Sequence, residues 1–346
     1  MAASPIASTV ASELPRVGAL PRLGFVGVGW IGLHRLRSVI AAECSEIVGI
    51  ADVHRQAADE AVAVSASPHA RVMSFEELLK SDLDGIVIAT PNSQHAAQVL
   101  AALDHGIHVF CQKPLARTAA EVTQIIRRAH ERDRLLAVDF CYRNVEGVRQ
   151  MKSHIQRGLI GRVYAADLTF HNAYGPDKPW FFDRRSAGGG CVMDLGIHLI
   201  DLALWMLDFP EVRGLSSRRY RNGKRLDADT LELENYGTLE LDLENDVEAR
   251  MACSWHLHAG RDAVIEAIFY GTNGSLRLRN LNGSFFDFTI EHCEGTRCRT
   301  LASPGPDWGG VAICEWARQL AGSPSFDPTA AHIEDVHRVL DEIYRR

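Results

Sequence analysis

The sequence predicts two domains: an α/β domain built on a parallel sheet and, after it, an α+β domain built on a mostly antiparallel sheet. Three observations carry this prediction. The chain has 346 residues, about twice the size of an average domain. Segments with strand and helix patterns alternate as far as Arg143, which is typical of a parallel sheet. Long extended segments follow Arg143. We therefore expect one domain over residues 21–143 and a second over residues 144–346. Residues 1–20 are expected to form a loose tail.

The composition is that of an ordinary globular protein, with 46% hydrophobic and 23% charged residues. Lysine and arginine number 37 against 44 acidic residues, which gives a net charge of -7 without any basic block. This balance disfavours nucleic acid and anionic membranes as partners. No apolar run is long enough to span a bilayer, and the first twenty residues lack a basic segment followed by an apolar core. We therefore expect neither a membrane span nor a signal peptide.

Eight cysteines are scattered along the chain, most of them in apolar segments. This usage is typical of buried thiols in a reducing compartment, so we expect a cytoplasmic protein. Two of them are close enough in sequence to form a local bridge, but we expect both to be free thiols. These two are Cys293 and Cys298, and the others are Cys44, Cys111, Cys141, Cys191, Cys253 and Cys314.

Short apolar runs and helix signals define the elements of the first domain. Capping boxes at Ser74–Glu77 and Thr118–Glu121 each begin a helix, the second of which extends to about Asp133. The other expected helices are Ile31–Ala41 and Ser93–His105. The expected strands are Leu23–Val28, Ile47–Asp52, Gly85–Ala89, His108–Cys111 and Leu135–Phe140.

The second domain is defined by longer segments. Residues 247–257 alternate between apolar and polar side chains, which predicts a strand with one buried face. Thr272–Ser275 reads as a hairpin turn between two strands. Arg162–His171 reads as another strand. The expected helices lie around Val148–Ile155, after the glycines within Ala187–Leu207, and at Val311–Leu320 and Ala330–Tyr344.

A glycine motif follows the first strand directly and precedes the first helix. It reads Gly27-Val28-Gly29-Trp30-Ile31-Gly32, the GxGxxG pattern that lets a pyrophosphate approach a helix N-terminus. Asp52 ends the next strand, 20 residues after Gly32, where a carboxylate reaches the adenosine ribose. The motif predicts a dinucleotide site, against the alternative of a glycine turn with a helix-capping aspartate. Asp52 favours NAD, whereas the nearby Arg55 is suited to the phosphate of NADP.

A lysine lies where a doubly wound sheet binds its ligands. Cys111-Gln112-Lys113-Pro114 ends the strand His108–Cys111, and ligands bind outside the carboxyl ends of such strands. Lys113 is therefore a candidate for contact with a substrate. The alternative is an ordinary surface lysine in a loop.

Three polar residues interrupt an otherwise apolar helix. Asp194, His198 and Asp201 follow the glycines Gly188–Gly190 at helical spacing and share one stripe. Buried ionisable groups are costly unless they are paired or used. We interpret Asp194 and His198 as an acid/base pair and Asp201 as part of a structural network.

Together these motifs resemble the Gfo/Idh/MocA family of oxidoreductases, which includes glucose–fructose oxidoreductase and inositol dehydrogenase. The similarity extends over roughly residues 20–345. The family motifs appear in order as the glycine motif, Thr90-Pro91-Asn92 with His95, Lys113-Pro114, and the segment Gly188–His198.

The resemblance implies a Rossmann domain that binds NAD(P) and a second domain whose open sheet face makes a homodimer or homotetramer. It implies that Thr90, Pro91, Asn92 and His95 lie beside the nicotinamide, and that Lys113 is also a cofactor contact. It also implies catalytic roles for Lys113, Asp194 and His198 in oxidising a secondary alcohol of a sugar or cyclitol, or in the reverse reaction. His198 is the candidate acid/base and Asp194 orients it or holds a substrate hydroxyl, but the sequence leaves open whether His198 or Lys113 carries the proton.

Gln112 departs from the family pattern, which commonly has a glutamate before the lysine. A neutral amide cannot tune the lysine pKa as a carboxylate does, so we expect an altered site. Further candidates for substrate contact, all polar or aromatic and near expected domain junctions, are Arg143, Asn172, Tyr174 and Trp180. We expect no metal ion.

The leading functional hypothesis is an NAD(P)-dependent dehydrogenase or reductase acting on a small polyhydroxy substrate. An alternative within the family is an NAD-dependent glycosidase that uses transient oxidation. An alternative from another class is a non-catalytic dinucleotide-binding sensor, which the neutral Gln112 keeps open.

Overall fold

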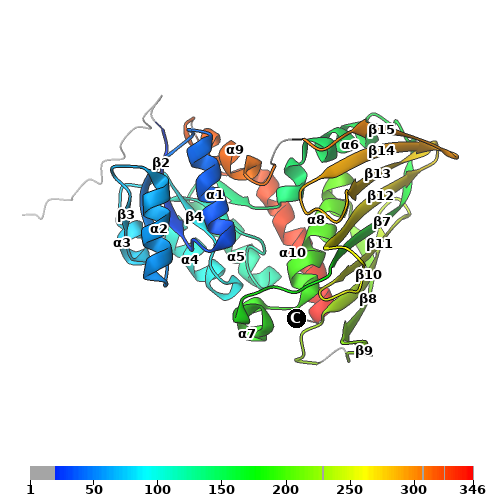
Figure 1. Cartoon of the computed structure of the whole chain (residues 1–346), viewed down its shortest axis with the longest axis horizontal. Helices are drawn as coiled ribbons and strands as arrows, with labels where there is room; N and C mark the ends of the chain where they lie inside the picture. Colours follow the sequence, from blue (N-terminus) through cyan, green and yellow to red (C-terminus); the bar gives the residue numbers. More distant parts are fainter. Residues whose placement is uncertain (1–19, 228–229, 306–307, 323, 346) are drawn as a thin grey trace, which may run out of the picture.

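The computed structural model describes residues 20–227, 230–305, 308–322 and 324–345. The expected tail over residues 1–20 therefore lies, except for Leu20, outside the described residues. Two β-sheets dominate the fold, with helices packed between and around them (Figure 1). The two-layered arrangement confirms the predicted fold class, an α/β Rossmann domain joined to an α+β domain with an open-faced sheet.

The first sheet has six parallel strands in the order β3-β2-β1-β4-β5-β6, which is the doubly wound Rossmann order. Its central strands are buried along almost their whole length, because helices cover both faces. The strands are β1 (Arg22–Val26), β2 (Glu46–Ala51), β3 (Arg71–Val72), β4 (Gly85–Ile88), β5 (His108–Cys111) and β6 (Leu136–Val138).

Five helices belong to this sheet. The capping box at Ser74 is confirmed, since its side chain accepts from the backbone of Glu77, whose carboxylate accepts from the backbone of Ser74. Helix α2 is an element that the sequence analysis does not predict. The helices are α1 (Trp30–Ala41), α2 (Arg55–Ser65), α3 (Phe75–Leu79), α4 (Asn92–Asp104) and α5 (Ala119–Glu131).

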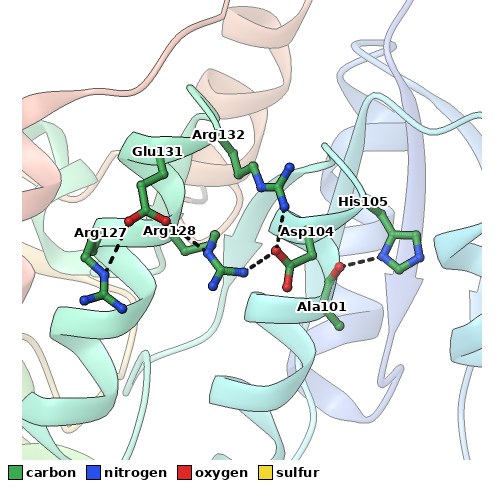
Figure 2. Close-up of polar contacts among 7 residues, drawn as sticks. All are labelled: Ala101, Asp104, His105, Arg127, Arg128, Glu131 and Arg132. Atoms are coloured by element: carbon green, nitrogen blue, oxygen red, sulfur yellow. Dashed lines mark hydrogen bonds and ion pairs between the residues drawn. The ribbon is translucent and has the colours of Figure 1, made fainter. Parts of the chain in front are cut away.

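Helices α4 and α5 are joined at the surface by a chain of charged residues (Figure 2). Asp104, the last residue of α4, accepts from Arg128 and from Arg132, the latter at 3.2 Å. Glu131 pairs with Arg128 at 3.3 Å and with Arg127 at 3.5 Å. Because these side chains are partly to largely exposed, each pair adds little to the free energy of unfolding.

The second sheet has nine strands in the order β15-β14-β13-β12-β7-β11-β10-β8-β9. All neighbours are antiparallel except β7 and β11, which are parallel. The predicted hairpin turn after Gly271 is confirmed, whereas the strand predicted over 247–257 ends at Ser254. The strands are β7 (Val163–Asn172), β8 (Val212–Arg221), β9 (Lys224–Arg225), β10 (Tyr236–Leu243), β11 (Val247–Ser254), β12 (Ala263–Gly271), β13 (Gly274–Asn280), β14 (Phe288–Glu294) and β15 (Arg297–Ala302).

Among the residues that the structure describes, helices cover one face of this sheet and not the other. Figure 1 shows α6 (Glu146–Gln156), α8 (Ile197–Met206) and α10 (His332–Tyr344) between the nine strands and the Rossmann layer, and the opposite face bare. Helix α8 is buried nearly all round. The segment 184–206 is long and apolar enough to cross a membrane by composition, but it lies buried in the fold. The apolar stripe of the sheet and α8 together form the main core.

One helix of the second segment packs on the first sheet. Helix α9 (Val311–Leu320) lies against α1 and β5, and its Trp316 ring is 5.6 Å from the ring of Phe110. The predicted segment 144–346 is therefore not confined to the second sheet. The chain crosses back after β15 and completes the core of the Rossmann layer.

One expectation about the cysteines is wrong. Cys293 and Cys298 form a disulfide instead of two free thiols. They lie directly opposite each other on the antiparallel pair β14–β15, which brings their side chains together. The other cysteines are free, and all of them but Cys141 are buried.

Candidate active site

The glycine motif forms an open cradle between β1 and α1. Gly27 has φ +82, and a Cβ there would lie 2.5 Å from the carbonyl oxygen of Ala89. A Cβ on Gly32 would lie 2.1 Å from the oxygen of Gly27, so neither position accepts a side chain. Gly29 instead faces open space, and no side chain caps the helix that begins at Trp30. Uncapped helix N–H groups beside open space fit a pyrophosphate.

Asp52 is fixed beside this cradle. One carboxylate oxygen accepts from Val28 N–H and the other from His54 N–H, both at 2.8 Å. Arg55 is exposed and its guanidinium bonds both carboxylate oxygens of Asp59 at 3.0 Å. The arrangement fits a carboxylate that accepts hydrogen bonds from a ribose. Arg55, which could instead bind the phosphate of NADP, is paired with Asp59 of the same helix.

Two large apolar side chains are exposed at the cradle, one within the glycine motif and one next to Asp52. Trp30 is 71% exposed and Val53 is 90% exposed. Trp30 is a predicted cofactor contact, whereas Val53 is missed by the sequence analysis. Exposed apolar groups that flank a polar cradle are typical of a surface that a ligand covers.

The loop after β4 brings the next predicted residues together, but their side chains bond protein groups. The ring nitrogens of His95 lie 2.7 Å from the carbonyl oxygens of Pro114 and Thr90. Asn92 donates to the carbonyl of Ala187 at 2.8 Å, across to the second domain. Pro91 precedes α4 as its N-cap. The loop is thus hydrogen-bonded both to the segment that carries Lys113 and to the segment that carries Asp194. Its contact with a nicotinamide stays a prediction.

Lys113 and Asp194 meet although 81 residues separate them. The Lys113 ammonium donates to Oδ1 of Asp194 at 2.7 Å and to its backbone oxygen at 2.8 Å. Lys113 follows β5, and Asp194 lies in a π-helical turn, Val192–Gly196, that precedes α8. Side chains of both residues are less than one-fifth exposed. The sequence analysis predicts a regular helix through Asp194; the π-turn is a local widening that periodicity does not reveal.

Trp255 completes the surroundings of Asp194. Its indole Nε1 donates to Oδ2 of Asp194 at 3.1 Å, so both carboxylate oxygens are held. Phe181 and Phe182 pack against the Trp255 ring, and Trp180 stacks on Phe181 at 3.8 Å between ring centroids. The sequence analysis assigns Trp255 only to the apolar face of a strand. The sequence could have indicated this contact only through the general rule that the N–H of a buried indole requires a hydrogen-bond acceptor.

His198 is buried against aromatic rings, and no hydrogen bond joins it to Asp194. Its ring is 5.1 Å from the ring of Tyr142, edge to face, and 6.2 Å from that of Phe170. Burial, and secondarily the positive charges of Lys113 and Arg35, hold the pKa of His198 well below its usual range. The imidazole is therefore neutral near pH 7 and can accept a proton. The orientation of His198 by Asp194 is not seen, since the hydrogen bonds of that carboxylate come from Lys113 and Trp255; the alternative, that Asp194 holds a substrate hydroxyl, stays a prediction.

The remaining predicted residues differ in their surroundings, and their contact with a substrate stays a prediction. The Arg143 guanidinium forms a paired contact with buried Asp201, with Nε 3.0 Å from Oδ2, so Asp201 is structural and Arg143 neutralises it. Asn172, at the end of β7, has a buried amide oxygen without a partner among the described residues. Tyr174 is 49% exposed and lies 6.1 Å from the ring of Phe285.

A buried carboxylate missed by the sequence analysis anchors the helix that carries Asp194. Glu234 Oε1 accepts from the N–H groups of Gly190 and Val192 and from the hydroxyl of Tyr344, the last at 2.6 Å. Tyr344 in turn accepts from Met193 N–H at 3.1 Å. A Cβ on Gly190 would lie 2.0 Å from the backbone oxygen of Glu234, which explains the glycine there. Within the described parts of the chain, no group of three or more His, Cys, Asp or Glu residues is arranged to hold a metal ion.

Two family models match the chain. Residues 21–140 match the model described as "Oxidoreductase family, NAD-binding Rossmann fold", and residues 148–277 match the "GFO/IDH/MocA C-terminal domain". Together the two matches cover most of the chain.

Among curated proteins, inositol 2-dehydrogenase of Acidothermus cellulolyticus is 30% identical over 323 residues, which is 89% of this chain and 87% of the relative. Inositol 2-dehydrogenase 3 of Saccharopolyspora erythraea is 30% identical over 74% of this chain and 72% of its own length. 1,5-Anhydro-D-fructose reductase of Ensifer adhaerens is 32% identical over 54% of this chain. That alignment spans only 56% of the reductase.

A solved structure of levoglucosan dehydrogenase with NADH and levoglucosan covers 94% of this chain and 97% of its own, with a TM-score of 0.80 and 22% identity. A second neighbour, GenD2 from gentamicin A biosynthesis in complex with NAD, covers 99% of this chain and 97% of its own, with a TM-score of 0.79 and 20% identity. At this identity the two structures establish the shared fold.

Proposed function

Because the chain belongs to the GFO/IDH/MocA family of NAD(P)-dependent oxidoreductases, we propose that it interconverts a secondary alcohol and a ketone on a sugar, a cyclitol or a related polyol. The observation that carries this proposal is the contact between Lys113 and Asp194 beside a neutral His198. It lies past the carboxyl end of β5, where this sheet type binds its ligands.

The cradle Gly27–Gly32 would hold the pyrophosphate of the cofactor, and Asp52 would accept hydrogen bonds from its adenosine ribose. We propose NAD as the preferred cofactor, because the Asp52 carboxylate repels an added phosphate and Arg55 is paired with Asp59. When bound, the dinucleotide supplies a nicotinamide ring that accepts or returns a hydride.

Lys113 holds the reacting oxygen of the substrate. An ammonium has three N–H donors, and two of those of Lys113 go to Asp194. Among the described residues the third has no acceptor, so it is available to a substrate oxygen. A fixed positive charge there stabilises the negative charge that develops on that oxygen.

His198 moves the proton. Its imidazole is neutral and no hydrogen bond from the described residues occupies it, so it can take the hydroxyl proton during oxidation and return it during reduction. Asn172 offers its unpartnered amide oxygen to a second hydroxyl, as a polyhydroxy substrate requires. Trp180 and Tyr174 belong to the aromatic surroundings and offer ring faces to the C–H side of a sugar.

NADH formation in a panel of polyols, sugars and glycosides, run with NAD and with NADP, tests this function. We expect oxidation of at least one free polyol or sugar. Release of a sugar from a glycoside without net NADH formation would instead support the glycosidase. Tight cofactor binding with no turnover on any compound, in either direction, would support the non-catalytic sensor and overturn the proposal.

The assembly and location are proposals of the same kind. The uncovered face of the nine-stranded sheet is available to a second copy, so we propose a homodimer or homotetramer through that face (Figure 1). Light scattering after size exclusion measures the mass, and a monomer would contradict it. The six free cysteines support a cytoplasmic location, where thiols stay reduced, whereas the Cys293–Cys298 disulfide is of the kind that oxidising compartments favour.

A further inference from the structure

Three buried polar residues from three different elements meet behind Lys113. Arg35 projects from α1, Gln112 follows β5, and Asp139 follows β6. Oδ2 of Asp139 accepts from Arg35 Nε at 2.6 Å and also from the side-chain amide of Gln112. All three residues are at most 7% exposed. A carboxylate acceptor requires the amide nitrogen of Gln112 to face it, so this residue acts as a donor.

This cluster connects the cofactor cradle with the residue that follows Gln112. Helix α1 begins in the glycine motif, and Arg35 lies on its buried face. Asp139 N–H donates to the carbonyl of Cys111 at 2.9 Å, and Gln112 N–H donates to that of Ile88 at 2.9 Å. The backbone just before Lys113 is thus tied to β4, to β6 and, through Asp139, to α1.

The cluster contains one ion pair and adjoins a second. Arg35 and Asp139 neutralise each other, and Lys113 and Asp194 form a second neutral pair. The sequence analysis expects an altered site because position 112 carries no charge. In the structure a carboxylate is nevertheless present, one hydrogen bond away at position 139.

We propose that Asp139 is a positioning residue for Lys113 that acts through Gln112, and that the amide at 112 and the carboxylate at 139 form one matched unit facing Arg35. A carboxylate at both positions would place two buried negative charges within hydrogen-bond distance of each other. An amide at both positions would take from buried Arg35 the carboxylate that its Nε bonds at 2.6 Å. One carboxylate between the two positions keeps both the hydrogen bond that joins them and their present net charge.

The catalytic part of this inference rests on the proposed function, whereas the coupling between the two positions does not. The test is a double-mutant cycle with Gln112→Glu, Asp139→Asn and the double variant, which exchanges the two groups. At about pH 8 we expect each single variant to lower kcat about tenfold and the double variant to return to within about threefold of wild type. The affinity for NAD, read by protein fluorescence, and the KM of the alcohol should change less than about threefold, because neither ligand touches the cluster.

A matched control exists on the surface. Gln156 donates to exposed Asp208 at 3.2 Å, so Gln156→Glu creates the same pair of carboxylates in water. We expect kcat of this variant to stay within about twofold of wild type, since exposed charges interact weakly.

The pH profile separates a charge effect from a general loss of structure. Two adjacent carboxylates share a proton at a raised pKa, so Gln112→Glu should recover activity relative to wild type as the pH falls from about 8 to about 5.5. The double variant, with one carboxylate, should show a constant ratio to wild type. Comparison with wild type at each pH removes the titration of the other groups near the cluster, which are His34, Cys111, Lys113, Cys141, Asp194 and His198.

If Asp139→Asn does not fold, Gln112→Glu and the double variant still decide the question. Rescue by the second substitution supports the matched unit, and a double variant worse than Gln112→Glu overturns it. If wild type turns over no substrate, the proposed function fails separately. The free energies of unfolding of the same variants are then measured in urea. If the change in the double variant equals the sum of the changes in the single variants, positions 112 and 139 do not form a matched unit.

Discussion

The ammonium of Lys113 and the carboxylate of Asp194 lie 2.7 Å apart. Lys113 follows the carboxyl end of β5 in the Rossmann sheet, and Asp194 lies in a π-turn of the second segment. This contact defines the meeting point of the two layers. It places a fixed positive charge beside a carboxylate that two donors hold from opposite oxygens. The chemistry proposed for the site depends on this geometry, and its parts can be changed one at a time.

Trp255→Phe removes one of the two donors to Asp194 and keeps an aromatic ring. We expect kcat to fall about tenfold, because a carboxylate released at Oδ2 can rotate and no longer holds Oδ1 in place against the Lys113 ammonium. Steady-state kinetics with unchanged circular dichroism measure this effect. Trp205→Phe is the control, since Trp205 contacts Lys152 away from the site. Equal kcat values for wild type and Trp255→Phe would show that the indole N–H has no role in positioning.

Asp52→Ala tests how the cofactor is selected. Loss of the carboxylate removes the ribose contact and the repulsion of a phosphate, so the affinity for NAD should fall about tenfold while that for NADP rises. Titration of each cofactor measures both dissociation constants. Asp59→Asn releases Arg55 but leaves Asp52 in place, and its affinity for NAD should equal that of wild type. An unchanged ratio of the two affinities in Asp52→Ala would contradict the assignment.

Tyr344→Phe tests the anchor of the helix that carries Asp194. Glu234 would keep its two backbone donors but lose the hydroxyl, and Met193 N–H would lose its acceptor. We expect the free energy of unfolding to fall by about 1–3 kcal/mol. Urea unfolding measures this change, with exposed Tyr164→Phe as the control. A loss as small as that of the control would mean that Glu234 does not need the hydroxyl.

His108 predicts how stability depends on pH. Burial, with a smaller contribution from Arg134, lowers the pKa of His108 to about 4, and its Nδ1 accepts from Leu135 N–H at 2.8 Å. An unfolded histidine binds a proton near pH 6.5, so the unfolded state takes up the proton first as the pH falls. Between about pH 7.5 and about pH 5, His108 should therefore cost the folded state about 2 kcal/mol.

The measurement compares urea unfolding of wild type and His108→Asn at both pH values. The variant should lose less stability on acidification than wild type, by about that amount. Parallel losses in the two proteins would show that His108 is accessible to protons in the folded state.

Much of the fold is visible in the sequence because its signals are local. The strand runs, the capping box at Ser74 and the glycines at Gly27 and Gly32 depend on neighbouring residues, and the structure has them where they are expected. Helix α2 is missed because no side chain caps it and the residues it buries, Ala58, Ala61 and Ser65, are all small.

What the sequence does not reveal depends on contacts between distant residues. Trp255 meets Asp194 across 61 residues, Tyr344 meets Glu234 across 110, and Arg35 meets Asp139 across 104. Helix α9 has an ordinary amphipathic pattern, and nothing in that pattern says which of the two sheets it covers. Composition likewise does not show that Lys113 bonds the carboxylate of Asp194, which was expected to orient His198.

The most direct test of the proposed chemistry is Lys113→Met, compared with Lys152→Met on the first substrate that the panel identifies. Lys152 also has a carboxylate partner, Asp208, 2.7 Å away, but lies outside the site. Lys113→Met should lower kcat at least about a hundredfold while the affinity for NAD stays within about threefold of wild type. Lys152→Met should keep nearly full activity. If Lys113→Met turns over its substrate as fast as Lys152→Met, the site of hydride transfer lies elsewhere.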